Sequence, residues 1–254
     1  MPSWMRTHRG DGFPFLLSVP HGGLLVPTEV RDFCCLSQQD VRTDGDVHAA
    51  EIYWPLAQSS RAFIASHVAR AIIDLNRAEK DWSRDGVVKS HTCWEELVYD
   101  PAPPDSLLSE LVDRYWKPYH AQLTELFGPD ILVGIDCHTM AAHGPPIGPD
   151  PNAPRPLICL GNVRGDSCPD AWLEMFADAL EQTFGERPSL NEPFAGGYIT
   201  RGHGASRPWI QLEISRSDRM SAGEKRERLR AALELFAEAL QATQKSRSTE
   251  GALP

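Results

Sequence analysis

Short apolar runs alternate along this chain with segments of helical spacing, and this alternation limits its possible folds more than any other feature. Three of the runs have the length and the apolar character of strands buried on both faces, namely residues 13–19, 131–140 and 210–216. Buried strands that alternate with helices are typical of a sheet covered on both sides. The sequence therefore predicts a single α/β domain over residues 1–245 with a mixed, mostly parallel sheet. Residues 246–254 are expected to form a disordered tail.

The remaining elements follow from the same two periodicities. Further strands are expected at residues 61–68, 69–77 and 157–162. Helices are expected at residues 46–58, 105–127, 169–185 and 221–244. Pro118 is expected to kink the second helix, and Ser221 with Glu224 has the spacing of a capping box that opens the last one. Residues 78–103 are polar and rich in breakers, which predicts a long loop.

Charge and cysteine content exclude several classes of function. The 254 residues carry 25 Lys and Arg against 35 Asp and Glu, a formal net charge of −10. Nucleic-acid binding needs clustered positive charge, so no nucleic-acid partner is expected. No apolar run approaches the ~20 residues of a membrane-spanning helix, so no membrane partner is expected either. The six cysteines contain no CxxC pair, which favours reduced thiols in a cytoplasmic protein.

Polar side chains stand where several of the predicted strands end. His21 follows strand 13–19, and Asp136 and His138 lie near the end of strand 131–140. Because ligands bind at the carboxyl ends of parallel strands, these residues mark a candidate site. Asp136 and His138 are two positions apart on one strand, so they project to the same side, and Asp136 could orient His138 or bind the same metal ion.

Two imidazoles that converge at one edge of a sheet can hold a metal ion. Catalytic zinc sites take three protein ligands and leave one position for water. His21 and His138 would supply two ligands, and the third would come from the segment TDGDVH, which contains Asp44, Asp46 and His48. Either aspartate could instead cap the following helix, so this segment by itself does not separate a ligand from a cap.

Glu213 is the most informative single residue, because it lies inside the apolar strand IQLEISR. A buried carboxylate costs free energy unless it is paired, hydrogen-bonded or protonated. One interpretation is a buried salt bridge with a nearby arginine. The other is a general base whose burial raises its pKa toward the range useful for accepting a proton from water.

Arginines near the strand ends suggest a site for an anion. Arg70, Asn76 and Arg77 belong to the segment ARAIIDLNR, and a guanidinium group can bind a carboxylate through two hydrogen bonds. Arg201 lies in the glycine-rich segment 196–204, which we expect to be a mobile active-site loop. Surface charge with no ligand is the alternative, above all for Arg70.

Six segments, taken in order, resemble the N-formylglutamate amidohydrolase family. They are SVPHGG, TDGDVHAAEIY, ARAIIDLNR, GIDCHTM, PFAGGYITRGHG and IQLEISR, and the similarity spans residues 13–217. The resemblance implies a three-layer α/β/α fold similar to that of zinc carboxypeptidases and aspartoacylases. It also implies hydrolysis of an N-formyl or N-acyl amino acid, typically N-formyl-L-glutamate to formate and glutamate in histidine degradation. The chain departs from the family's pattern at Val47, Ala69 and His203.

The resemblance further implies roles for the matching residues. One Zn²⁺ ion would be held by His21, Asp46 and His138. Glu213 is similar to the glutamate that activates water, and we expect Arg70 to stabilise the oxyanion. The carboxylates of the anionic substrate would be held by Asn76, Arg77 and Arg201.

Two other functions stay open at this point. The first is a metallo-carboxypeptidase or deacylase that acts on another N-acyl amino acid or on a small peptide. The second is a noncatalytic protein that binds a dicarboxylate through Arg77, with a structural zinc ion or none. The sequence leaves the oligomeric state open.

Overall fold

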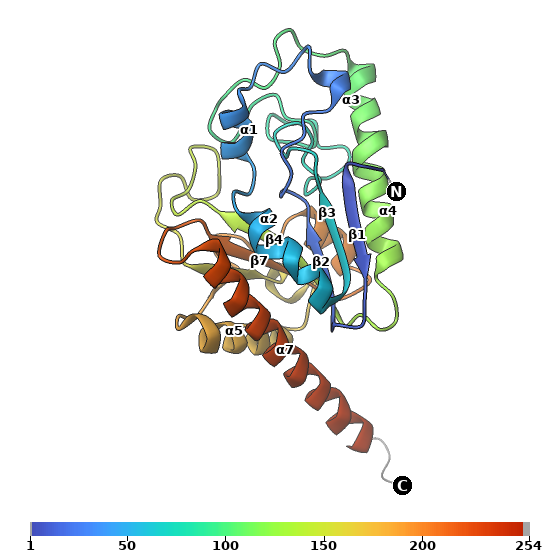
Figure 1. Ribbon diagram of the computed structural model, residues 1–254, viewed down its shortest axis with the longest axis vertical. Helices are drawn as coiled ribbons and strands as arrows, with labels where there is room; N and C mark the ends of the chain where they lie inside the picture. The colour runs from blue at the N-terminus through green and yellow to red at the C-terminus, as the bar shows by residue number, and fades with distance from the viewer. Residues whose placement is uncertain (1, 251–254) are drawn as a thin grey trace.

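The computed structural model describes residues 2–250, which build a sheet of seven strands in the order β1-β3-β2-β4-β7-β5-β6 (Figure 1). The strands are β1 Met5–Arg9, β2 Phe13–Val19, β3 Ser60–Ser66, β4 Val133–Met140, β5 Ile158–Gly161, β6 Ser189–Leu190 and β7 Trp209–Ser215. The central strands β3, β2, β4 and β7 are mutually parallel, whereas β1 is antiparallel to β3, and β5 is antiparallel to β7 and parallel to β6. The predicted mixed, mostly parallel sheet is confirmed.

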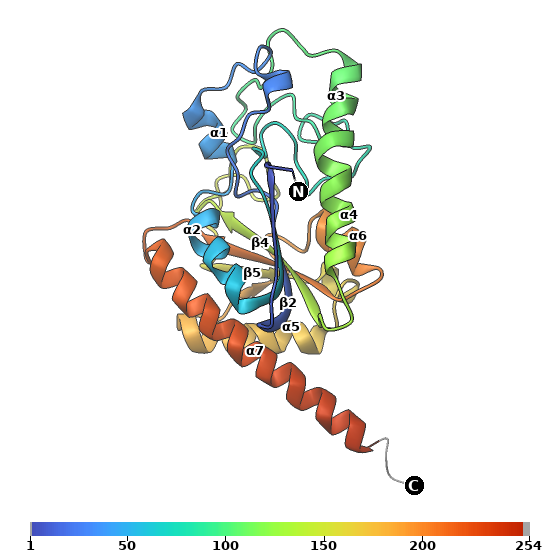
Figure 2. The same cartoon turned by 45° about the vertical axis from the view of Figure 1, so that its right-hand side comes forward.

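Helices cover both faces of this sheet, which gives the three-layer α/β/α fold (Figure 2). The helices are α1 Gln38–Asp44, α2 Ala49–Tyr53, α3 Asp105–Leu111, α4 Lys117–Leu126, α5 Asp170–Phe184, α6 Tyr198–Gly204 and α7 Ala222–Glu250. Helices α2, α5 and α7 pack on one face, and α4 and α6 pack on the other. Among residues 2–250, no helix is both long enough and apolar enough to cross a bilayer.

Strand β2 shows why the sequence folds into three layers. Phe15, Leu17 and Val19 point into the core under α2, α5 and α7, whereas Leu16 points into the core under α4. Successive side chains of a strand face opposite sides, so a continuous apolar run fills two cores at once. Ser18 lies on the α4 side, where its hydroxyl is 3.0 Å from the Tyr119 hydroxyl.

Most of the predicted elements are found close to their expected positions. The runs at residues 13–19, 61–68, 131–140, 157–162 and 210–216 correspond to β2, β3, β4, β5 and β7. Helix α5 ends at Gly185, whose φ of 78° suits a glycine cap. The Ser221–Glu224 capping box is present, and α7 continues to Glu250 rather than ending near residue 244. Residues 251–254 of the expected tail lie outside the described residues.

The predicted strand at residues 69–77 is wrong. Only Val68 and Ala69 form isolated bridges, to Leu25 and Gly23, and the chain then turns. Ala69, Ile72 and Ile73 are buried. Their apolar character therefore reports burial inside a folded loop, which a short apolar run does not distinguish from a strand.

The predicted mobile loop at residues 196–204 is also wrong, because residues 198–204 form helix α6. Its first amides find side-chain acceptors from distant parts of the chain: the Gly197 amide donates to Gln211 Oε1, and the Ile199 amide donates to Asn76 Oδ1 at 2.7 Å. Ile199 and Thr200 are buried. Nε2 of His203 lies 2.9 Å from Nδ1 of His120.

The predicted helix at residues 105–127 is present as α3, a π-helical turn at Val112–Trp116, and α4. Pro118 lies in the first turn of α4, directly after the π-helical turn, and the backbone is helical through both. A proline inside a helix cannot donate the usual hydrogen bond, and here the regular α-helical pattern is interrupted just before it. The predicted helix at residues 46–58 is divided into α2 and the 3-10 helix Trp54–Ser59, which begins next to Pro55. Strands β1 and β6 and helix α1 were not predicted.

Phe236 of α7 provides a test of the packing between α7 and the sheet. Its ring is fully buried and stacks on Phe15 of β2 at 5.2 Å and on Phe176 of α5 at 4.7 Å. Phe236→Ala is expected to lower the free energy of unfolding by about 3–5 kcal/mol, because it leaves a cavity between the three elements. Denaturant unfolding measures the change. Glu238→Ala on the exposed side of α7 is the control, with an expected change within about 0.5 kcal/mol; equal losses would contradict this packing role.

Candidate metal centre

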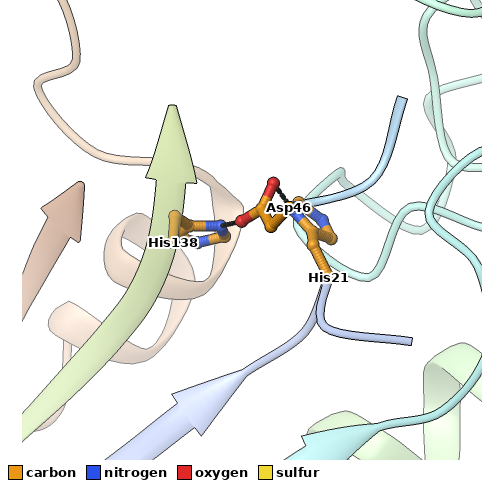
Figure 3. Close-up of side chains that lie close together, drawn as sticks. All are labelled: His21, Asp46 and His138. Carbon is orange, nitrogen blue, oxygen red and sulfur yellow. Dashed lines mark hydrogen bonds and ion pairs between the residues drawn. The ribbon is translucent and has the colours of Figure 1, made fainter. Parts of the chain in front are cut away.

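Three side chains from separate segments converge at the carboxyl edge of the parallel strands (Figure 3). His21 follows β2, His138 lies on β4, and Asp46 immediately precedes α2. One ligand atom from each residue lies within 4.8 Å of the others, and all three side chains are buried. We call these residues the His–Asp–His cluster. The strand ends meet because β2 and β4 are parallel neighbours.

Both imidazoles are oriented by outer carboxylates. His21 Nε2 lies 2.7 Å from Asp74 Oδ1, and His138 Nε2 lies 2.9 Å from Asp136 Oδ2. Their Nδ1 atoms face Asp46 instead, at 3.0 Å from His138 and 3.8 Å from His21. A carboxylate that accepts the N–H of one ring nitrogen leaves the other nitrogen as a metal donor, which is the usual environment of a metal-binding histidine. The donor set fits a divalent metal ion.

Asp46 rather than Asp44 stands beside the two histidines. Asp44 is fully buried elsewhere, where its carboxylate accepts from the Cys93 amide and lies 3.5 Å from Lys89 Nζ. Burial alone would raise the pKa of Asp44, but Lys89 and Arg70 outweigh it and lower that pKa to about 2. Asp44 is therefore an ionised partner of buried cations.

The titration of the cluster is consistent with a cation between its members. Burial lowers the pKa of His21, which favours the neutral imidazole that a metal requires. Burial also opposes protonation of His138, yet Asp136 and Asp46 outweigh it and raise the pKa of His138 well above its ordinary value. The carboxylates that favour a proton on His138 would equally favour a metal cation in its place.

Glu213 lies on β7 directly across from His138 on β4. Its side chain is buried at the same cavity, and Gln211 Nε2 donates to its Oε1 at 2.8 Å. Burial raises the pKa of Glu213 to about 7. Within residues 2–250 no Lys or Arg nitrogen lies within 4.0 Å of this carboxylate, so the buried salt bridge considered from the sequence is not formed.

A cavity of about 460 Å³ opens onto the cluster and Glu213. Its wall includes six arginines: Arg70, Arg77, Arg155, Arg164, Arg201 and Arg216. Arg70 Nε donates to Asp74 at 3.1 Å, and Arg77 Nη2 donates to Asp85 at 2.6 Å. The cavity can therefore attract an anion although the chain as a whole is acidic.

Asn76 has a different environment from the one expected for a substrate contact. It is buried, its Nδ2 donates to Asp136 Oδ2 at 3.0 Å, and its Oδ1 accepts from the Ile199 amide. Its amide thus links the carboxylate that orients His138 to the start of α6. Asn76 also borders the cavity, where a substrate contact would compete with these bonds.

Sequence reasoning missed three residues of the site. Asp74 orients His21, and the fully buried Lys89 lies 3.5 Å from Asp74 and 2.9 Å from Asp85. Arg216 Nη2 lies 3.5 Å from Asp46 and donates to the Thr139 carbonyl at 3.0 Å. Asp74 stands in an apolar run, which is the same signal that marked Glu213. Lys89 carries no such signal, because it lies in a polar loop.

The fold and the cluster together define a three-layer α/β protein with a candidate metal centre at the carboxyl edge of its parallel strands. Crystal structures share this fold. N-formylglutamate amidohydrolase from Ralstonia eutropha JMP134 matches with a TM-score of 0.76 at 18% identity, over 96% of this chain and 100% of that chain. A gene product of Agrobacterium tumefaciens matches with a TM-score of 0.71 at 16% identity, over 94% of each chain.

Sequence comparison identifies the family. The N-formylglutamate amidohydrolase family model matches residues 13–220. The N-formylglutamate deformylase of Pseudomonas putida is 28% identical over 241 residues, or 88% of each chain. That of Pseudomonas aeruginosa is 26% identical over 220 residues, or 80% of each chain. The chain belongs to the N-formylglutamate amidohydrolase family, as its six motifs suggested.

Asp74→Asn tests whether the outer carboxylate prepares His21 for a metal ion. The amide would weaken the charge-assisted hydrogen bond to Nε2 and with it the orientation and basicity of the ring, so the affinity for a divalent metal ion is expected to fall about 10–100-fold. Competition with a chelator measures this affinity. Asp130→Asn, at an exposed aspartate near Arg61, is the matched control. An Asp74 variant that folds and binds metal as tightly as this control would contradict the role.

Proposed function

We propose that this protein hydrolyses N-formyl-L-glutamate to formate and L-glutamate. The observation that carries the proposal is Glu213, a buried carboxylate with no cationic partner among the described residues, beside the His–Asp–His cluster in a cavity rich in arginine. Membership of the family, and two relatives named N-formylglutamate deformylase, support the choice of substrate.

The proposed cofactor is one Zn²⁺ ion, held by His21, Asp46 and His138. Two imidazoles and a carboxylate make a three-ligand set of the kind found in catalytic zinc sites. A zinc ion bound there would lower the pKa of water and polarise the formyl carbonyl group.

Glu213 is proposed to move the proton that the reaction requires. Its carboxylate would accept a proton from the water that attacks the formyl carbon. It would then donate that proton to the amide nitrogen as the carbon–nitrogen bond breaks, which releases formate and the free amine of glutamate. A pKa raised to about 7 by burial suits a group that must both accept and donate near neutral pH.

Arginines of the cavity are proposed to bind the charges of the reactants. Arg70 Nε donates to Asp74 and Nη1 to the Asp44 carbonyl, and among residues 2–250 no acceptor is found for Nη2, which leaves it for the oxyanion. Arg77, Asn76 and Arg201 line the same cavity and are proposed to contact the carboxylates of the substrate.

The proposed setting is the cytoplasm, in the degradation of histidine. All six cysteines are free thiols in the structure, which is the usual state in a reducing compartment.

Formate release from N-formyl-L-glutamate, measured with the metal content of the same sample and a chelator-treated control, tests the reaction. Release that stops on chelation and returns with Zn²⁺ supports the reaction and its cofactor together. Release of other acids in preference to formate would favour a deacylase of different specificity.

Glu213→Gln tests the proton transfer. The amide has nearly the same shape but cannot accept the proton, so kcat is expected to fall about 10²–10⁴-fold with the metal content and KM little changed. Glu238→Gln on the exposed side of α7 controls for the substitution itself. A Glu213→Gln protein that binds metal and keeps the full kcat would exclude Glu213 as the base. Tight binding of L-glutamate without turnover, in both the wild type and the variant, would favour the noncatalytic alternative.

A further inference from the structure

The arginines that line the cavity fall into two groups. Four have an acidic group within 4.0 Å: Arg70 with Asp74, Arg77 with Asp85, Arg155 with Asp150, and Arg216 with Asp46. Arg164 and Arg201 have no acidic partner within that distance among residues 2–250, and both are exposed at the cavity wall. These two guanidinium groups are therefore available for an anion from solution.

The backbone that carries Arg164 is held in a costly conformation. Val163 has φ of 54° and Arg164 has φ of 55°, a region that residues with a side chain rarely adopt and that a β-branched valine avoids most. Asn191 Oδ1 accepts from the amides of Asn162 and Arg164, at 3.1 and 3.2 Å. Asn162 is fully buried. Strained residues that their surroundings hold in place concentrate at ligand-binding sites, and here the hydrogen bonds to Asn191 hold the backbone of Arg164 at the cavity wall.

The same short segment anchors both unpaired arginines. The Val163 amide donates to the Ala195 carbonyl at 2.6 Å, and Arg201 Nε donates to the next carbonyl, that of Gly196, at 2.9 Å. Gly196 has φ of 143°, and a Cβ there would lie 2.7 Å from Val163 Cγ2. Only glycine therefore lets the two segments approach this closely. Val163, the neighbour of Arg164, and the side chain of Arg201 are thus held by two adjacent carbonyl groups, and both arginines line the same cavity.

Arg164 and Arg201 stand outside the network of contacts that holds the reacting centre. Arg70 contacts Asp74, which orients His21, and Arg216 lies near Asp46 of the cluster. In the described part of the chain, no hydrogen bond or ion pair joins Arg164 or Arg201 to a cluster residue or to the carboxylates that orient it. An anion bound by this pair would therefore be a charged group of the substrate other than the carbonyl at the cluster.

We propose that Arg164, together with Arg201, binds the side-chain carboxylate of the substrate and so sets the preference for an acidic amino acid. This role rests on the proposed hydrolysis of N-formyl amino acids. Arg164 acts on substrate binding and takes no part in the proton transfer. Two guanidinium groups can share one carboxylate through charge-assisted hydrogen bonds, which are stronger than neutral ones.

The test compares two substrates that differ only at the remote group, N-formyl-L-glutamate and N-formyl-L-glutamine. For Arg164→Gln, kcat/KM with the glutamate substrate is expected to fall about 10-fold or more, mainly through KM. With the glutamine substrate it is expected to change less than about twofold. Arg164→Lys is expected to recover part of the loss, because it restores the charge without the two-pronged geometry.

Two further variants sharpen the result. Arg219→Gln removes an exposed arginine that pairs with Glu186 outside the cavity, and should leave both substrates unaffected. If Arg164 and Arg201 share one carboxylate, the loss in the double variant Arg164→Gln, Arg201→Gln should be smaller than the product of the single losses. An equal loss on both substrates would mean a structural role for Arg164, and no loss on either would mean no contact; each overturns the proposal.

Failure of the proposed function is separable from failure of this inference. If the wild-type protein releases no formate from either substrate, the function fails, and the inference is decided by binding of L-glutamate against L-glutamine, measured by calorimetry on the metal-loaded protein. Wild-type preference for L-glutamate that Arg164→Gln reduces about 10-fold supports the carboxylate site. Absence of that preference, or its retention in the variant, overturns it.

Discussion

The carboxylate of Asp74 is the group on which the rest of the site depends. It is fully buried, and it accepts hydrogen bonds from His21 Nε2, Arg70 Nε and the backbone N–H of Asn76. Nζ of Lys89 lies 3.5 Å away. Burial by itself would raise the pKa of Asp74, but its interactions with His21, Arg77, Arg70 and Lys89 outweigh burial and lower that pKa well below its ordinary value. A buried charge without such partners would cost several kcal/mol. The segment around residue 74 is therefore held where it can orient a cluster histidine and an arginine of the cavity at once.

The parallel sheet supplies the second constraint, because it decides which residues can meet. His21, His138 and Glu213 are far apart in sequence, but they lie on or just after β2, β4 and β7, which are neighbours with the same direction. Their side chains consequently reach the same edge. Asp46 then completes the group from the segment before α2, where its Oδ2 accepts from the Thr139 amide at 3.1 Å. The sheet places three of these residues, and hydrogen bonds with the Thr139 amide and the His21 carbonyl hold Asp46.

Much of this arrangement could be predicted from the sequence, and the reasons for success and failure are physical. Strands such as Phe13–Val19 can be predicted from the sequence because a strand buried on both faces is apolar along nearly its whole length. Residues 69–77 also contain a short apolar run but fold as a loop, since their polar backbone groups are satisfied by distant partners such as the Val87 carbonyl, which accepts from the Asp74 amide. Helix α6 was missed for the same reason, because the acceptor for its Ile199 amide, Asn76, lies 123 residues away. The local sequence pattern indicates which residues are buried and the periodicity of the apolar positions. It does not indicate hydrogen bonds between segments that are far apart in the sequence.

Asn76 shows how one buried amide can couple two halves of a site. Its Nδ2 supports Asp136, and through it His138, while its Oδ1 holds the first turn of the helix that carries Arg201. A shift of this amide would therefore disturb the cluster and the cationic wall of the cavity together. The acidic composition of the chain is compatible with an anionic ligand for a related reason. Apart from Glu213, the carboxylates nearest the cluster are paired with histidines, arginines or Lys89, so the unpaired positive groups of Arg164 and Arg201 contribute most to the charge that the outer cavity presents. A net charge of −10 spread over the whole surface has little influence at that distance scale, because exposed charges are screened within about 10 Å.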